Sequence, residues 1–210
     1  MIQVMKTILE NDKEFICNIK APCFQMLTPE EIKIVSESKT QVLFRKDDHI
    51  TKQGAFASYV LFMVSGYARQ YLEAEGTRNF NLRIIKPGEF VGLSSVFNGN
   101  TFEYSSVAIT ECQAYLIEKK AIADVAKQNG PFGFNIIKRY CELNNNLLST
   151  IRTLMYKQMN GRMADTLLYI DSFRKERSDI FQLLSRKDLA EFAGISTEST
   201  VKLLKSFEKD

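Results

Sequence analysis

The most informative stretch of the sequence spans residues 185–208 and reads SRKDLAEFAGISTESTVKLLKSFE. Ser185 is followed three residues later by Asp188, a spacing that caps the start of a helix. Gly194 can adopt the left-handed conformation of a turn without steric penalty, and Ser196 can cap a second helix just after it. The pattern predicts two short helices around a tight turn. A DNA-binding helix-turn-helix and an ordinary helical hairpin both have this form.

The second helix of this pair has an inward and an outward face. The inward face repeats at helical spacing and consists of Thr200, Leu203, Leu204 and Phe207. The outward side chains suit the major groove of DNA, where the first of them reach base edges and the later lysines reach phosphates. We therefore predict a DNA-binding surface formed by Arg186, Ser196, Thr197, Glu198, Ser199, Val201, Lys202 and Lys205.

The composition narrows the class of protein. The chain has 210 residues, 45% of them hydrophobic, which is enough for a sizeable core. Its net charge is only +3, and residues 159–210 contain equal numbers of basic and acidic side chains, so composition alone does not indicate a nucleic-acid binder. No apolar run reaches the length of a membrane helix and no signal-peptide pattern begins the chain, so we expect a cytoplasmic protein without a membrane partner.

Residues that could carry catalysis or bind a metal are few. His49 is the single histidine, so a histidine metal site or a Ser-His or Cys-His catalytic pair has at most one participant. The cysteines form no CxxC motif and are expected to be reduced and mostly buried: Cys17, Cys23, Cys112 and Cys141. We therefore expect no enzyme, no catalytic residue and no metal site.

Two kinds of hydrophobic periodicity divide the first part of the chain. Residues 1–34 are expected to be helical, with a helix start at Thr28-Pro29-Glu30-Glu31. From about residue 41 to residue 117 the period is two, and turn signals separate short runs typical of strands: 41–44, 59–65, 67–72, 79–85, 105–109 and 113–117. Many short strands with regular turns indicate a β-sandwich or a barrel.

Residues 130–158 return to a helical pattern and carry a heptad repeat. Two series of residues recur at intervals of seven and occupy the a and d positions of three heptads: Ile137, Asn144 and Ile151, with Tyr140, Leu147 and Leu154. A seam this narrow favours pairing with a symmetric partner helix over packing on the chain's own core. An Asn144 pair across a two-fold axis would fix the register, so we predict a parallel homodimer.

Three further stretches match motifs of one known family. They are residues 62–69 (FMVSGYAR), residues 86–92 (KPGEFVG) and residues 160–168 (NGRMADTLL). The first resembles a strand-turn motif, the second a P-G-D/E-x-x-G loop, and the third a hinge followed by the first helix of a DNA-binding domain. Together with the helix-turn-helix, these stretches resemble the cyclic-AMP receptor protein/FNR (Crp/Fnr) family of bacterial transcription regulators over essentially the whole chain.

The resemblance implies an α+β fold in three parts. These are a cyclic-nucleotide-binding-like β-roll (jelly roll) over residues 1–129, a dimerisation helix over 130–158, and a helix-turn-helix domain over 159–210. The hinge between the last two would lie at Asn160 and Gly161. Relatives continue beyond the readout helix with a wing, so we expect a missing or truncated wing in a sequence that ends at Asp210. The implied partners are double-stranded DNA with a pseudo-palindromic site, a second copy of the chain, and RNA polymerase.

The resemblance also assigns the base-reading side chains to Thr197, Glu198 and Lys202. Glu198 can accept a hydrogen bond from a cytosine amino group, and Lys202 can donate to guanine or to a phosphate. Many relatives carry Arg where this chain has Thr197. Because Thr cannot form the bidentate contact of Arg with guanine, we expect a different preferred half-site.

The resemblance further implies an effector pocket in the β-roll. Its candidate residues are Arg83, Gly92, Leu93, Ser94, Ser95, Tyr104, Ser105 and Ser106. Cyclic-nucleotide binders of the family carry a Glu for the ribose after the glycine and an Arg-Ser pair for the phosphate further on. This chain lacks the Glu, and Tyr104 or Glu103 takes the place of the Arg. We therefore expect no binding of cyclic AMP and leave open an unidentified small-molecule effector.

An FNR-type iron–sulfur cluster and a protein without DNA binding are the remaining alternatives. Cys17 and Cys23 have the spacing of two cluster ligands, but the other two positions hold Glu14 and Ala114, and Cys112 comes two residues early. Because such clusters normally need four thiolates, we expect no cofactor. The main alternative function is a small-molecule-binding signalling module that does not bind DNA.

Overall fold

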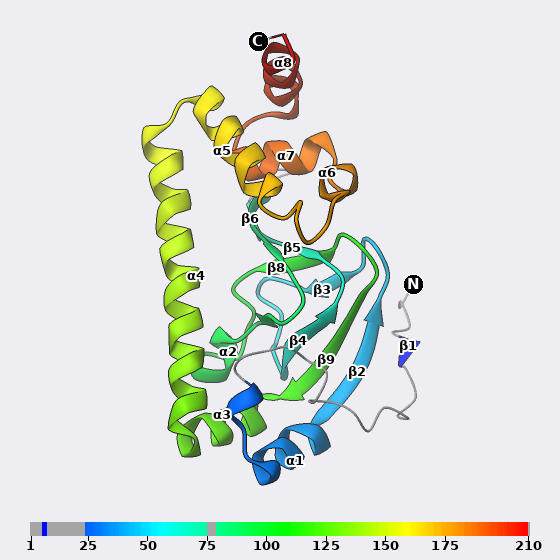
Figure 1. Cartoon of the computed structure of the whole chain (residues 1–210), viewed down its shortest axis with the longest axis vertical. Coiled ribbons are helices and arrows are strands. Elements are labelled where there is room, and N and C mark those ends of the chain that lie inside the picture. Colours follow the sequence, from blue (N-terminus) through cyan, green and yellow to red (C-terminus); the bar gives the residue numbers. More distant parts are fainter. Residues whose placement is uncertain (1–5, 8–23, 75–78, 210) are drawn as a thin grey trace. The chain divides into compact units, whose positions relative to one another are not determined.

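The structure, a computed structural model, describes residues 6–7, 24–74 and 79–209 (Figure 1). These residues form two compact units. The first consists of Met1–Gln70 and Ile84–Leu143, and the second of Tyr71–Arg83 and Asn144–Asp210. The second unit thus contains the end of a hairpin from the β-rich part of the sequence together with the C-terminal helices.

The strands form two antiparallel sheets in a β-roll (Figure 1). The first sheet has the order β1-β2-β9-β4-β7, with β1 at Lys6–Thr7, β2 at Lys39–Phe44, β9 at Cys112–Glu118, β4 at Tyr59–Ser65 and β7 at Phe90–Val91. The second has the order β3-β8-β5-β6, with β3 at His49–Thr51, β8 at Ser105–Ala108, β5 at Ala68–Glu73 and β6 at Asn79–Ile85. Pairing of strands that are distant in sequence, such as β2 with β9, gives the β-roll its closed form.

Helices and an aromatic cluster close one end of this β-roll. The helices are α1 at Pro29–Glu37, α2 at Ser94–Phe97 and α3 at Lys119–Gln128, and a short 3₁₀ helix at Phe24–Met26 precedes them. The rings of Phe24 and Phe62 pack edge to face with centroids 4.8 Å apart, and Phe90 lies 5.1 Å from Phe62. Phe132 from the long helix α4, at Gly130–Tyr156, joins the same buried cluster. Such aromatic pairs add directional contacts to the hydrophobic burial of the core.

The start of α1 is confirmed, but the helical expectation for residues 1–34 is wrong at Lys6–Thr7. Thr28 caps α1 in a full capping box with Glu31, and Pro29 occupies the first turn. Lys6–Thr7, however, form strand β1 paired with β2, and within the described residues the first α-helix begins at Pro29. Backbone pairing at a sheet edge overrides a local helical pattern, since an edge strand offers free hydrogen-bonding groups. Residues 8–23 lie outside the described residues.

All six expected strands are present, whereas several shorter elements were missed, among them β3, β7 and α3. β4 and β6 have the predicted bounds, and β2, β5, β8 and β9 differ from theirs by one or two residues at an end. The missed strands β3 and β7 are three and two residues long, too short to show an alternation of apolar and polar residues. The missed helix α3 buries Ala121, Ile122 and Val125, which have ordinary helical spacing.

The long helix α4 runs from Gly130 to Tyr156, and α5 runs from Met159 to Asp171. The break between them falls at Lys157 and Gln158, with Gln158 as the residue before α5. Asn160 and Gly161, expected to form the hinge, therefore lie inside the first turn of α5. The Arg162 guanidinium donates to the carbonyl oxygens of Leu154 and Lys157, and these contacts satisfy the end of α4.

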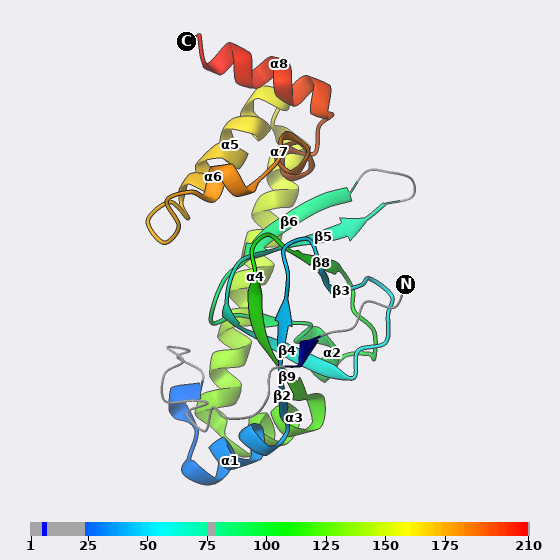
Figure 2. The ribbon, with the colours of Figure 1, turned by 90° about the vertical axis from the view of Figure 1, so that its right-hand side faces the viewer.

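The helices of the second unit pack around a small core of their own. α5 is followed by α6 at Ile180–Leu183, α7 at Arg186–Ala193 and α8 at Thr197–Phe207. Met163, Ile170 and Ile180 are fully buried. Figure 2 shows α7 nearly end-on and α8 from the side, so the two helices cross after the turn that joins them. This is the arrangement expected of a helix-turn-helix.

Candidate nucleic-acid interface and effector pocket

The two helices and the turn of the candidate nucleic-acid interface have the predicted caps. The Asp188 N–H donates to Ser185 Oγ at 3.1 Å, and the Ser185 N–H donates to the Asp188 carboxylate at 2.8 Å. Gly194 has φ +64° and ends α7 in the left-handed conformation. The Ser199 N–H donates to Ser196 Oγ at 3.1 Å at the start of α8. Local hydrogen-bonding chemistry alone therefore builds the turn.

The inward face of α8 is confirmed at its start and only in part at its end. Thr200 is fully buried, and its hydroxyl donates to the Ser196 carbonyl oxygen at 3.1 Å. Leu203 and Leu204 are half-buried. Phe207, expected to point inward, is 37% exposed because it lies in the last turn of α8, where its ring is only partly covered.

The predicted DNA-binding side chains lie on the free face of this pair of helices. Thr197, Glu198, Lys202 and Lys205 are exposed, as is Arg186 at the start of α7, while Ser196, Ser199 and Val201 are half-buried. Glu198 and Lys202 form an ion pair of 2.7 Å, although both side chains are more than 70% exposed. An exposed pair at this spacing contributes only about 0.3–0.5 kcal/mol. It is therefore weak enough for both side chains to exchange it for contacts with a ligand.

The heptad seam of α4 is exposed along most of its length. Ile137 and Tyr140 are more than 50% exposed, Leu147 and Ile151 are each 42% exposed, and Asn144 is exposed between them. Leu154 is half-buried, and its Cδ2 lies 3.0 Å from the position that a Cβ on Gly194 would occupy. Apart from Leu154, the expected dimer residues thus form a largely apolar stripe that the described residues leave exposed.

A second row beside this seam was missed by the sequence analysis. Phe134, Cys141, Leu148 and Met155 recur at intervals of seven at the e positions, and all four are exposed. Phe134 and Met155 are 68% and 69% exposed. The seven-residue spacing was the available signal, and it widens the apolar stripe from a and d positions to a, d and e.

Within the β-roll, the candidate effector pocket is built around Gly92. Gly92 has φ +78°, and its N–H donates to the Tyr104 hydroxyl oxygen at 2.7 Å. The Phe102 ring covers the other side, since a Cβ on Gly92 would lie 2.5 Å from a ring carbon. Ser95 is buried and donates its hydroxyl to the Gly92 carbonyl oxygen at 2.7 Å. Of the two neighbouring residues Glu103 and Tyr104, Tyr104 thus contacts Gly92, whereas Glu103 is exposed.

The other candidate pocket residues are divided between several places. Ser105 accepts a hydrogen bond from the Gln53 N–H at 2.9 Å, and the Ser106 hydroxyl lies 2.7 Å from the Thr51 hydroxyl. Leu93 is buried beside Gly92, and Ser94 begins α2. Arg83 belongs to the second unit. The serines of β8 thus take part in hydrogen bonds within the β-roll.

Among the described residues there is no group of three His, Cys, Asp or Glu side chains that could hold a metal ion. Cys112 is buried, its thiol donates to the Tyr67 carbonyl oxygen at 3.2 Å, and burial raises its pKa to about 11. Such a thiol is largely protonated at neutral pH and is a poor ligand or nucleophile. Cys17, Cys23 and Glu14 lie outside the described residues. None of the helices in the described part of the chain is long and apolar enough to span a membrane.

Comparisons with known proteins match this architecture. Residues 41–129 match the family described as "Cyclic nucleotide-binding domain". The chain is 24% identical over 196 residues to a "CRP-like cAMP-activated global transcriptional regulator" of Mycobacterium tuberculosis, which covers 90% of this chain and 86% of the relative. The Crp/Fnr resemblance of the sequence motifs is therefore supported by an alignment over most of the chain.

Solved structures of Crp/Fnr-type regulators have a fold similar to that of this chain. A transcriptional regulator of the Crp/Fnr family from Eubacterium rectale is 18% identical and has a TM-score of 0.73, covering 89% of this chain and 86% of that one. The c-di-GMP-responsive global regulator CLP from Xanthomonas campestris is also 18% identical with a TM-score of 0.73, covering 87% of this chain and 93% of that one. Identities this low establish the fold alone.

Proposed function

We propose that the chain is a homodimeric, sequence-specific DNA-binding transcription regulator, because residues 41–129 match the cyclic nucleotide-binding domain family and the chain has the fold of Crp/Fnr regulators. One observation carries this proposal. The helix α8, capped at Ser196 and anchored by the buried Thr200, exposes Thr197, Glu198 and Lys202 on one face. A buried anchor and a polar free face are what a readout helix in the major groove requires.

Charge on α8 is arranged to read bases without repelling the DNA backbone. Glu198 alone would be repelled by phosphates, but Lys202 lies 2.7 Å away and balances its charge. In the major groove, the carboxylate can accept a hydrogen bond from a cytosine amino group while the ammonium donates to guanine O6 or N7. Lys205, one turn after Val201, is placed for a phosphate. The pair therefore favours a C·G base pair in each half-site.

The exposed stripe on α4 supports a parallel homodimer. Ile137, Tyr140, Leu147 and Ile151 would each be covered by the same stripe of a second copy, which buries apolar surface that this chain leaves in water. Asn144, exposed in the middle of the stripe, can pair with its partner's equivalent and fix the register. A two-fold dimer presents two readout helices, so its DNA site would be pseudo-palindromic with half-sites about one helical turn apart.

The β-roll would be an effector domain that does not take cyclic AMP. The Gly92 N–H is engaged by Tyr104, and the ring of Phe102 lies against the same residue. A cyclic phosphate needs a cation or several donors at its site, and Glu103 beside Tyr104 brings the opposite charge. A different small molecule remains the candidate effector, and RNA polymerase is the further partner that a transcription regulator would contact.

Selection of DNA from a random library, followed by fluorescence anisotropy with the full chain, tests this function. We expect enrichment of a pseudo-palindrome, and an affinity that falls linearly with the logarithm of salt concentration as phosphate contacts release counterions. Equal affinity for the selected and random duplexes, or no binding to either, would contradict the proposal. The latter result would favour the signalling module without DNA binding.

A further inference from the structure

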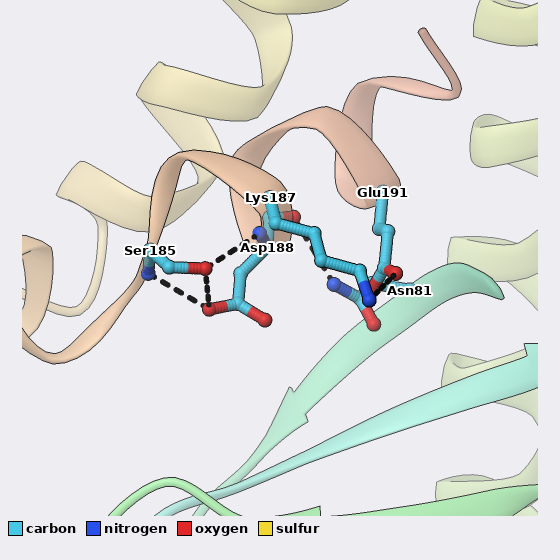
Figure 3. Close-up of polar contacts among 5 residues, drawn as sticks. All are labelled: Asn81, Ser185, Lys187, Asp188 and Glu191. Carbon is cyan, nitrogen blue, oxygen red and sulfur yellow. Dashed lines mark hydrogen bonds and ion pairs between the residues drawn. The ribbon is translucent and has the colours of Figure 1, made fainter. Parts of the chain in front are cut away.

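Strand β6 holds the first helix of the helix-turn-helix through a buried amide. The Asn81 side chain is 1% exposed, and its Nδ2 donates to the Asp188 backbone carbonyl oxygen at 3.1 Å (Figure 3). The two residues are 107 positions apart in sequence but belong to the same compact unit. Because buried amides require hydrogen-bond partners, this contact fixes β6 on the first turn of α7.

A second contact lies at the other end of α7. A Cβ on Gly194 would lie 3.3 Å from Cε2 of Phe80 and 3.0 Å from Cδ2 of Leu154. The Phe80 ring, on the residue before Asn81, therefore packs against the turn that directs the chain from α7 into α8. Contacts at Asp188 and Gly194 hold α7 at both ends, and Ser196, two residues beyond Gly194, already caps α8.

From these contacts we propose that Phe80 and Asn81 are positioning residues for the readout helix. They hold α7 and the turn that follows it in place, and this turn sets the orientation of α8. This inference rests on the proposed DNA binding, because the orientation of α8 affects binding only if α8 enters the major groove of DNA. A binding site performs well only when a supporting layer holds its side chains in place, and a shift of about 1 Å is enough to weaken it.

The brace formed by Phe80 and Asn81 leaves the DNA-facing side chains free. Glu198 and Lys202 are 78% and 74% exposed and pair with each other. The hairpin contacts instead reach Asp188 and Gly194, at the two ends of α7. The brace is therefore compatible with bound DNA, and its removal is expected to weaken specific binding.

Charge beside Asn81 determines which substitution is informative. Glu191 is 7% exposed, Lys187 Nζ lies 3.8 Å from its carboxylate, and Figure 3 shows both groups next to the Asn81 amide. Asn81→Asp would add a carboxylate beside Glu191, so the effect of losing the hydrogen bond could not be separated from the effect of charge repulsion. Asn81→Leu removes the donor, keeps the same branched arrangement of side-chain heavy atoms and adds no charge. Asn79→Leu is the matched control, because it makes the same change two residues away on β6.

The test compares the full-length wild type with Asn81→Leu, Phe80→Ala and Asn79→Leu. Loss of one hydrogen bond should lower affinity for the selected DNA site about threefold to tenfold. Affinity for random duplex and the slope of affinity against salt should stay unchanged, since every phosphate-binding side chain is still present. Amide hydrogen exchange of the DNA-free protein should accelerate in α7 and α8, while the amides of β2 and β9 keep their protection.

The outcomes separate this inference from the proposed function. The positioning role would be overturned if both variants bound DNA with wild-type affinity and their amide exchange in α7 and α8 were unchanged. Tighter DNA binding by the variants would also overturn it, because Phe80 and Asn81 would then oppose DNA binding. A wild type without any DNA preference refutes the proposed function instead, and the positioning role falls with it. If Asn81→Leu or Phe80→Ala does not fold, the same measurements are made on Phe80→Leu. This variant removes the aromatic ring but keeps an apolar side chain against Gly194.

Discussion

The hydroxyl oxygen of Tyr104 accepts a hydrogen bond from the backbone N–H of Gly92 at 2.7 Å. Backbone N–H groups in glycine turns are common donors to bound anions. Here the chain's own side chain takes that donor, and Phe102 packs against the same glycine. The turn at Gly92 is therefore completed by side chains of the same β-roll.

Replacing Tyr104 with Phe should destabilise the β-roll without creating a cyclic-AMP site. The substitution leaves the Gly92 N–H without this acceptor, and we expect a loss of about 1 kcal/mol in the free energy of unfolding. Urea unfolding measures that loss, and calorimetry with cyclic AMP should give no binding heat for wild type or variant. Tyr59→Phe, at a ring that is 42% exposed, is the control and should unfold like the wild type. Saturable binding of cyclic AMP by the wild type would contradict the absence of a cyclic-phosphate site in the β-roll.

The capping carboxylate of Glu31 should give the β-roll a pH-dependent stability. Hydrogen bonds from the Thr28 N–H at 2.8 Å and from the Asn129 amide at 2.7 Å hold the pKa of Glu31 below its ordinary value of 4.5. The folded state thus favours the ionised form of Glu31. The carboxylate therefore contributes to the free energy of unfolding above pH 4.5, and this contribution is lost as the pH falls through the lower pKa of the folded state.

Glu31→Gln is therefore expected to lower the free energy of unfolding at neutral pH, with a difference from wild type that shrinks in acid. Urea unfolding at pH about 7 and about 3 measures this change. Glu30→Gln, on the exposed neighbour in the same turn of α1, is the control and should show no such pH-dependent difference. An equal deficit of Glu31→Gln at both pH values would show that the carboxylate's charge contributes nothing.

Features set by a few neighbouring residues could be predicted from the sequence. The caps at Thr28, Ser185 and Ser196 and the left-handed Gly194 follow from side chains that bond to the nearest backbone groups. Their physics is complete within about four residues, so no knowledge of the fold is needed. Strand β4 at Tyr59–Ser65 was predictable as well, because a short apolar run that ends just before a turn glycine is typical of a buried strand.

Features that depend on distant residues could not be predicted in this way. The hydrogen bond from Asn81 to Asp188 spans 107 positions, and nothing in either local sequence indicates the other. Strand β7 exists because Phe90 and Val91 pair with β4. The contact of Phe102 with Gly92 likewise depends on the closed turn. The DNA-binding residues of α8 and the dimer residues of α4 depend on a second molecule and remain predictions.

Glu198→Ala should relax base preference at one position in each half-site. The carboxylate is 78% exposed on the free face of α8, where it can accept from a cytosine amino group. Its loss should remove about 1–3 kcal/mol of discrimination at that base pair, measured by anisotropy on a set of singly substituted duplexes. An equal loss on the selected site and on random DNA would remove the base-reading role from Glu198.

Lys205→Ala should weaken binding to every duplex alike. Lys205 is exposed in the last turn of α8 and is placed for a phosphate rather than a base. Removing one phosphate-binding ammonium per protomer should lower the slope of log affinity against log salt by about 0.9 for each phosphate that is no longer neutralised. Salt titration on selected and random duplexes measures both effects. A change restricted to one base position would place Lys205 among the base-reading residues instead.

Leu147→Glu should separate the dimer into monomers. Leu147 is 42% exposed at a d position of α4, and in a parallel pair it would face its equivalent in the partner copy. The substitution removes two leucines from the interface, each worth about 1.5–3 kcal/mol when buried, and places two like charges together. Sedimentation equilibrium at micromolar concentration should show a dimer for wild type and a monomer for the variant, with weaker binding to the palindrome. Ser149→Glu adds the same charge to an exposed position off the stripe and should leave the dimer intact. A monomeric wild type would refute the homodimer, and a dimeric Leu147→Glu would move the interface away from the stripe.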